Sequence, residues 1–172
     1  MILCIGWLVK LSDFLVRIVS AVVVALTLVM LTAIGWQIFM RYVFNRPPSW
    51  TEELALLCFT WVSLLMLALG VRQAFHARID LLANQLPRSW SDALNLLVLM
   101  MTAGFGAYLC LGGVTYVIET ASSVSAAIAY PIYALHFAAP VCGALVFFFA
   151  LEQFGLSVPS FIATQSDRRP PA

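Results

Sequence analysis

Four stretches of this sequence are each long enough and apolar enough to cross a lipid bilayer as an α-helix. A spanning helix needs about 20 predominantly apolar residues to cross roughly 30 Å of hydrocarbon. We expect the spans at residues 18–40, 53–71, 93–118 and 128–151. None of them carries a charged residue in its central turns. The pattern predicts an all-α integral membrane protein, with four transmembrane helices in a single membrane domain covering residues 1–156.

The composition excludes an ordinary soluble domain. Hydrophobic residues make up 63% of the 172 residues and charged residues only 10%, whereas a soluble domain usually carries about 25% charged residues. A soluble fold of this size has too little interior to hide so much apolar surface, so lipid must cover it. Nine basic residues against eight acidic ones give a net charge of +1, which offers no basis for a nucleic-acid partner.

The segments outside the spans have patterns of their own. Apolar residues recur at helical spacing before the first span, and Lys10, Asp13 and Arg17 fall on the opposite side. We interpret residues 5–17 as a short amphipathic helix at the membrane surface, although the same residues could equally extend the first span. The apolar run that follows is longer than the about 7–15 residues of a signal-peptide core, so we expect this helix to remain in the protein. Residues 157–172, rich in proline and polar side chains, are expected to form a loosely ordered cytoplasmic tail.

Basic residues indicate how the spans are oriented. Cytoplasmic loops of membrane proteins carry an excess of lysine and arginine. With the N-terminus inside, only Arg41 and Arg46 fall on the far side of the membrane. The basic residues on the cytoplasmic side are then Lys10, Arg17, Arg72, Arg78, Arg88, Arg168 and Arg169. We therefore expect both termini to be cytoplasmic.

Helix-start and helix-break residues agree with these spans. Residues 49–52 and 89–92 each have the order of a capping box, in which a hydroxyl and a carboxylate satisfy free amides at a helix start. Pro131 is expected in the first turn of the fourth span, where its missing amide is harmless. Pro140 is interior and should kink that helix; we interpret the kink as a matter of shape rather than as a ligand site. Gly143 has the spacing that allows another helix to approach closely.

The spans lack the groups that a transport path or a catalytic site would need. Transport inside a membrane usually requires an ionisable residue or a broken helix that exposes backbone dipoles. The middles of these spans offer only scattered Thr, Ser, Asn and Cys. His76 and His136 should lie near opposite faces of the bilayer, so they cannot clamp one haem iron. We therefore expect no enzyme activity, cofactor, metal site or substrate-binding site in this chain.

The densest group of polar residues lies between the first two spans. Arg41 ends the first helix, and Glu52 and Glu53 begin the second helix across a short turn. An ion pair between Arg41 and one of these carboxylates would lock the hairpin at the membrane surface, and such an exposed pair contributes about 0–1 kcal/mol. The alternative is a polar contact with a partner subunit. We adopt the hairpin lock as the hypothesis.

Three segments, residues 41–55, 70–82 and 131–143, together form a recognisable pattern. The residues that carry it are Arg41, Asn45, Trp50, Glu52, Glu53, Arg72, His76, Asp80, Pro131, Tyr133, Pro140 and Gly143. In order, spacing and total length, the pattern resembles the small membrane subunit of tripartite ATP-independent periplasmic (TRAP) transporters. The resemblance implies structural or partner-contact roles for these residues. The pattern departs from that family where Ala77 and Arg78 separate His76 from the next hydrophobic residue.

The resemblance implies a division of labour. In such systems a soluble periplasmic protein captures the substrate, often an organic acid, and a large membrane subunit moves it with a sodium gradient. The small subunit binds the large one and widens its scaffold in the membrane. The resemblance thus implies a bacterial inner-membrane location, with the large permease subunit, the periplasmic substrate-binding protein and membrane lipid as partners.

Two other function classes compete with this interpretation. A stand-alone homodimeric exporter would need a buried carboxylate within a span, and Glu52, Glu53 and Glu119 all sit at helix ends. A cytochrome or quinone-binding membrane anchor is disfavoured by the positions of the two histidines. The lack of a charge inside the spans therefore favours an auxiliary subunit.

Overall fold

The computed structural model describes the backbone of residues 2–83 and 88–166, with side chains for residue 6 and for residues 8–73 and 93–157. Its main elements are helices. Within the described residues, four helical stretches are long and apolar enough to cross a membrane: Leu8–Phe44, Trp50–Gln73, Ala93–Glu119 and Tyr133–Ser157. The prediction of an all-α membrane protein with four spans is therefore confirmed in length and composition.

The first helix is far longer than a single span requires. α1 runs without a break over Ile2–Phe44, a length of 43 residues, or about 65 Å at 1.5 Å per residue. Residues 5–17, which the sequence suggests as a surface helix or an extension of the first span, belong to this same helix. Because the hydrocarbon core is roughly 30 Å thick, α1 must either tilt strongly or extend beyond it.

The other helices begin close to where the sequence places them. α2 covers Trp50–Ala83 and begins within the first capping box, and α3 covers Arg88–Glu119. The fourth span is split into α4, Tyr133–His136, and α5, Ala138–Ser166. α5 therefore continues through residues 157–166, a segment for which the sequence suggests loose order.

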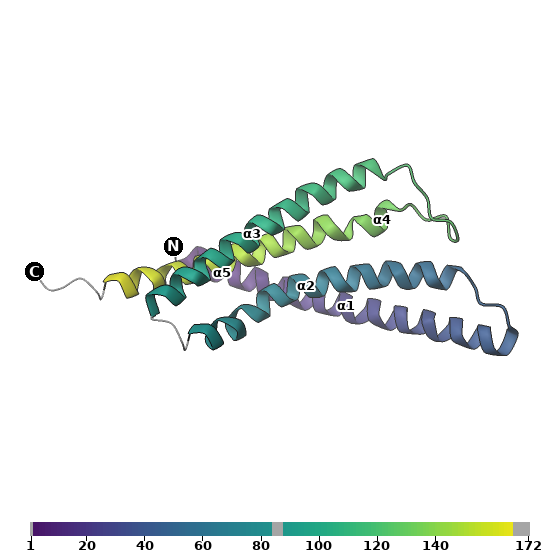
Figure 1. Cartoon of the computed structure of the whole chain (residues 1–172), viewed down its shortest axis with the longest axis horizontal. Coiled ribbons are helices and arrows are strands. Elements are labelled where there is room, and N and C mark those ends of the chain that lie inside the picture. Colours follow the sequence, from purple (N-terminus) through teal and green to yellow (C-terminus); the bar gives the residue numbers. More distant parts are fainter. Residues whose placement is uncertain (1, 84–87, 167–172) are drawn as a thin grey trace, which may run out of the picture.

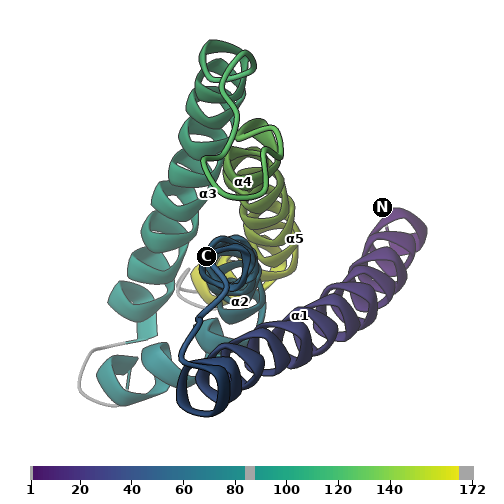
Figure 2. The ribbon, with the colours of Figure 1, turned by 90° about the vertical axis from the view of Figure 1, so that its right-hand side faces the viewer.

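The helices pack as two pairs that meet through α2 and α5 (Figure 1). α1 lies along α2, and α3 lies along α5. In the described part of the chain α1 and α3 do not touch, and Figure 2 shows them on opposite sides of the molecule. The two pairs diverge toward the end that carries residues 45–49 and 120–132, whereas α1 begins and α5 ends at the opposite end.

α2 contributes to both buried apolar clusters. Val19 and Val23 of α1 pack with Leu65 and Leu69 of α2. Ala68 of α2 belongs to a second cluster, whose other buried side chains are Cys142, Val146 and Phe149 of α5. Since lipid is as apolar as these side chains, the clusters stabilise the bundle by close packing rather than by escape from water.

The fourth span breaks at Phe137, between α4 and α5. Pro140 has no amide to donate to the carbonyl of His136, four residues earlier, and the helix is interrupted at this place. On the neighbouring helix, the indole Nε1 of Trp61 donates a hydrogen bond to the backbone carbonyl of Ala134 over 3.0 Å. The carbonyl of Ala134, close to the break, therefore has a hydrogen-bond partner inside the bundle.

Pro131 does not open the helix, contrary to the prediction. It forms an isolated antiparallel bridge with Val124, and the amide of Ile132 donates to the carbonyl of Ser123 over 3.0 Å. These contacts keep Pro131 and Ile132 paired with the earlier loop residues Ser123 and Val124. The helix consequently begins two residues later, at Tyr133.

Two glycines let the backbones of α3 and α5 approach closely. A Cβ on Gly143 of α5 would lie 2.4 Å from the backbone nitrogen of Cys110. One on Gly106 of α3 would lie 2.7 Å from the backbone nitrogen of Phe147. Both distances are too short for any real side chain, so the close approach predicted at Gly143 is confirmed.

Replacing Gly143 by alanine should weaken the bundle. The added methyl group would meet backbone atoms, which cannot rotate away, and we expect a loss of about 1–3 kcal/mol. Gly104→Ala on α3 is the matched control, because a Cβ there has nothing within 4 Å and alanine favours a helix. Thermal unfolding in detergent compares the two variants, and equal melting temperatures would contradict the packing described.

Candidate functional site

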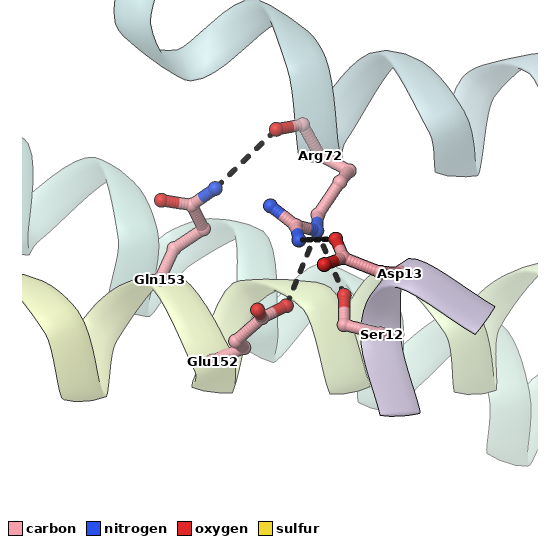
Figure 3. Close-up of polar contacts among 5 residues, drawn as sticks. All are labelled: Ser12, Asp13, Arg72, Glu152 and Gln153. Atoms are coloured by element: carbon pink, nitrogen blue, oxygen red, sulfur yellow. Dashed lines mark hydrogen bonds and ion pairs between the residues drawn. The ribbon is translucent and has the colours of Figure 1, made fainter. Parts of the chain in front are cut away.

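Five polar side chains from three helices meet near the ends of the spans Trp50–Gln73 and Tyr133–Ser157 (Figure 3). Ser12 and Asp13 come from α1, Arg72 from α2, and Glu152 and Gln153 from α5. We call these five residues the Arg72 cluster. Charged side chains from otherwise apolar helices come together here, which makes the cluster the first candidate for a functional role.

The guanidinium group of Arg72 is the centre of this cluster. Its Nε donates to the hydroxyl of Ser12 over 2.7 Å, and its Nη2 donates to Oδ1 of Asp13 over 2.9 Å. The same Nε lies 3.3 Å from Oε2 of Glu152. The side-chain amide of Gln153 donates to the backbone carbonyl of Arg72 over 3.3 Å. The cluster therefore ties α1, α2 and α5 together.

Glu152 is the most enclosed charge of the cluster. Its side chain is 2% exposed, whereas that of Asp13 is 58% exposed. The single Nε hydrogen of Arg72 points to Ser12, and both carboxylate oxygens of Glu152 lack a hydrogen bond among the described residues. Attraction to the charge of Arg72 is therefore the main compensation for burying this carboxylate.

Sequence reasoning found Arg72 but missed its partners. Glu152 directly follows the apolar run that ends at Leu151, so hydropathy places it at a helix end without a role. A comparison of how deep each charged residue lies along its span could have found Glu152. Once the four spans are laid antiparallel, Asp13, Arg72 and Glu152 fall at the same end of their helices.

The opposite end of the bundle has a second polar group, centred on Glu53 near the start of α2. Its carboxylate accepts hydrogen bonds from the hydroxyl of Ser125, the amide of Ala127 at 2.8 Å and the amide of Ile128 at 3.0 Å. We call these four residues the Glu53 anchor. The anchor fastens the 120–132 loop, which connects α3 to α4, onto α2.

The anchored loop is held by charge-assisted hydrogen bonds to Glu53 rather than by an ion pair, because residues 120–132 contain no charged side chain. Ala129 has a φ of 56°, in the left-handed region that residues other than glycine rarely adopt. The anchor holds the chain in this unfavourable turn. Burial raises the pKa of Tyr130 and the negative charge of Glu53 raises it further, since both disfavour the phenolate.

The predicted ion pair between Arg41 and the carboxylates of the second helix is not formed. Oε1 of Glu52 instead accepts a hydrogen bond from Nε2 of Gln37 over 2.8 Å, and Glu53 binds the loop. Among the side chains that the structure describes, both ion pairs belong to Arg72. The hairpin-lock hypothesis is therefore wrong, because Gln37 rather than Arg41 meets α2 at this level.

His136 is engaged within the chain. Its ring centroid lies 4.4 Å from that of Tyr116, and its Nδ1 lies 2.9 Å from the hydroxyl oxygen of Thr120. Because that hydroxyl donates its hydrogen to the carbonyl of Tyr116, Nδ1 must donate to Thr120. Among the residues described, no three His, Cys, Asp or Glu side chains gather as they would around a metal.

The remaining residues of the sequence pattern have local positions. Asn45 has a φ of 54° just after the end of α1. Trp50 begins α2 and is exposed, and Tyr133 begins α4. The side chains of His76 and Asp80 lie outside the described residues, so their expected roles stay predictions.

Arg72→Met should strongly destabilise the bundle. The substitution leaves Glu152 as an unpaired buried charge, and breaking a buried pair from one side costs up to about 3–5 kcal/mol. Asp13→Asn is the matched control, because exposed pairs contribute about 0–1 kcal/mol. Adding Glu152→Met to Arg72→Met should recover part of the loss. Thermal unfolding in detergent gives the comparison, and a double variant no more stable than Arg72→Met would refute the charge pair.

Glu53→Ala should release the 120–132 loop from α2. The amides of Ala127 and Ile128 lose their acceptor, so we expect them to exchange hydrogen roughly tenfold faster or more. Glu52→Ala is the matched control, since it breaks only the contact with Gln37 and should leave the loop protected. Hydrogen exchange followed by mass spectrometry measures both, and unchanged protection in Glu53→Ala would rule out the anchor.

Comparison with known proteins agrees with this architecture. The family model described as "Tripartite ATP-independent periplasmic transporters, DctQ component" matches residues 30–159. The sialic acid TRAP transporter small permease protein SiaQ of Vibrio cholerae is 31% identical over 97 residues, which cover 56% of each chain. The sialic acid TRAP transporter permease protein SiaT of Haemophilus influenzae is 45% identical over 51 residues, which cover 30% of this chain and 8% of SiaT.

The family match covers most of the membrane domain. Residues 30–159 contain the described parts of α2, α3 and α4, the last third of α1 and most of α5. The alignment with SiaQ spans about half the length of that relative, at 56%. The family is one of transporter membrane subunits rather than of enzymes. This multi-pass membrane chain therefore belongs to the DctQ family, the small permease component of TRAP transporters.

Proposed function

We propose that this chain is the scaffold subunit of a bacterial inner-membrane transporter and binds a large permease subunit. In that assembly the large subunit moves an organic acid with a sodium gradient, after a periplasmic binding protein delivers the substrate. One observation carries the proposal: within the described residues, the charges of the Arg72 cluster compensate one another, because Arg72 pairs with both Asp13 and the enclosed Glu152. Groups that hold three helices together are not free to carry an ion or a carboxylate across the membrane.

The match to SiaT supports the pairing with a large subunit. SiaT is named a permease protein, and the 51 matched residues make up 8% of it but 30% of this chain. SiaT is therefore several times as long as this chain and contains a segment similar to it. We expect the large subunit that binds this chain to correspond to the part of SiaT outside that segment.

The distribution of basic residues supports cytoplasmic termini. In this orientation the Arg72 cluster lies on the cytoplasmic side and the Glu53 anchor on the periplasmic side. Ser12 and Asp13 are held beside Arg72, at the cytoplasmic end of the second span. Residues 5–17 of α1 then form the amphipathic part of the helix at the cytoplasmic membrane surface.

A stand-alone exporter is the second candidate, and one observation favours it. Such a protein needs a buried carboxylate within a span, and Glu152 is 2% exposed within the span Tyr133–Ser157. Its charge partner Arg72 weighs against this role, because an exporter's carboxylate must be free to change partners during transport. The two candidates differ in whether this chain transports anything alone.

Purification followed by transport measurements tests the proposal. We expect the full chain, isolated from bacterial membranes in mild detergent, to bring a large permease subunit with it in equal amount. Liposomes should accumulate substrate under an inward sodium gradient only when both subunits and the binding protein are present. Sialic acid, which the names of both relatives contain, is the first substrate to try.

The controls separate the two candidates. Gly104→Ala should leave both co-purification and uptake unchanged, because its new methyl group contacts nothing. Transport by this chain without a large subunit, abolished by Glu152→Gln, would replace the scaffold with the exporter.

A further inference from the structure

Two arginines at the end of α1 have no counterion within the described chain. Arg41 and Arg46 are exposed, and neither side chain forms an ion pair or hydrogen bond with the residues described. The carboxylates that the sequence places nearby are engaged elsewhere. Glu52 accepts from Gln37, and Glu53 holds the loop after α3. The two arginines are therefore available to an anion from outside the chain.

The backbone brings these two arginines to one place. α1 ends at Phe44, and Asn45 turns the chain with a φ of 54°. The amide of Arg46 then donates to the carbonyl of Met40 over 3.4 Å. Met40 directly precedes Arg41, so the backbones at the two arginines lie beside each other. Their long side chains can therefore reach a common ligand.

The surface around the two arginines is aromatic. The exposed rings on the last turns of α1 and at the start of α2 are Trp36, Phe39, Tyr42, Phe44 and Trp50. Ring centroids are 5.7 Å apart between Trp36 and Phe39 and 6.1 Å apart between Phe39 and Phe44. Tryptophan and tyrosine collect at the depth where hydrocarbon meets lipid headgroups. The corner of α1 and α2 therefore lies at headgroup depth.

We propose that Arg41 and Arg46 together bind the phosphate of a phospholipid headgroup. Guanidinium groups bind phosphate oxygens through paired, charge-assisted hydrogen bonds, and phosphate is the anion that a bilayer supplies at this depth. The aromatic rings contact the acyl chains of the same lipid. The carboxylate of Glu52 opposes binding, because it is held beside Gln37, four residues before Arg41.

Lipid fits this corner better than an acidic protein surface does. A carboxylate of another subunit would neutralise the charge, but it would give the five exposed rings no apolar partner. A phospholipid supplies the anion and the hydrocarbon in one molecule, and Trp36 and Phe39 precede Arg41 on α1, on the side toward the middle of the span. This inference is independent of the transported substrate and of the large subunit.

Native mass spectrometry of the full chain in detergent, with phosphatidylglycerol added, tests the proposal. We expect the wild type to retain a bound phospholipid and Arg41→Gln/Arg46→Gln to bind it roughly tenfold more weakly or worse, as two interfacial arginines would contribute. Arg17→Gln removes the same charge from another part of α1 and should bind as the wild type does. Glu52→Gln should bind more tightly, a result that misfolding cannot produce.

Four results would overturn the proposal. Equal phospholipid binding by the wild type and the double variant would remove the site. An equal loss in Arg17→Gln would show unspecific attraction, and displacement of the lipid by inorganic phosphate would make the ligand a soluble anion. Unchanged lipid binding by the double variant, combined with loss of the large subunit on purification, would place the arginines at a protein interface.

Discussion

The ion pair between Arg72 and Glu152 fixes the arrangement of an otherwise apolar bundle. A bilayer gives its helices little reason to prefer one neighbour over another, because lipid tails are as apolar as the side chains that face them. Polar contacts and close backbone approach must therefore select the packing. Arg72 reaches α1 through Ser12 and Asp13 and α5 through Glu152, so one side chain determines both neighbours of α2.

Other polar contacts along α2 act in the same way. Trp61 donates to the carbonyl of Ala134 near α4, and the carbonyl of Leu64 accepts from the thiol of Cys142 on α5 over 3.0 Å. At the far end, Glu53 holds the loop between α3 and α4. Because the two helix pairs meet mainly through α2 and α5, these contacts determine how the pairs are held together along their whole length.

Hydropathy predicts the helices of this chain well, since length and apolarity are local properties, but it does not predict which polar groups meet. Arg41 and Arg72 look alike in the sequence, each as a basic residue at the C-terminal end of a span. Two carboxylates lie close to Arg41 along the chain, yet the level at which the two helices meet decides the contact, and Gln37, one turn before Arg41, meets Glu52 instead. The partner of Arg72 is 80 positions away, at Glu152, where no local pattern points to it.

The break in the fourth span argues for a helix-packing contact rather than a site for an ion or a substrate. Discontinuous helices in transporters bind ions and substrates through the backbone dipoles that the break exposes. Here the carbonyl of Ala134 is occupied by Trp61, and a Cβ on Gly113 would lie 2.7 Å from Cδ of Pro140, so α3 packs tightly against the break. A break filled by side chains and backbone of its own chain presents little to a substrate. The groups around the break are taken up by contacts among α2, α3, α4 and α5 instead.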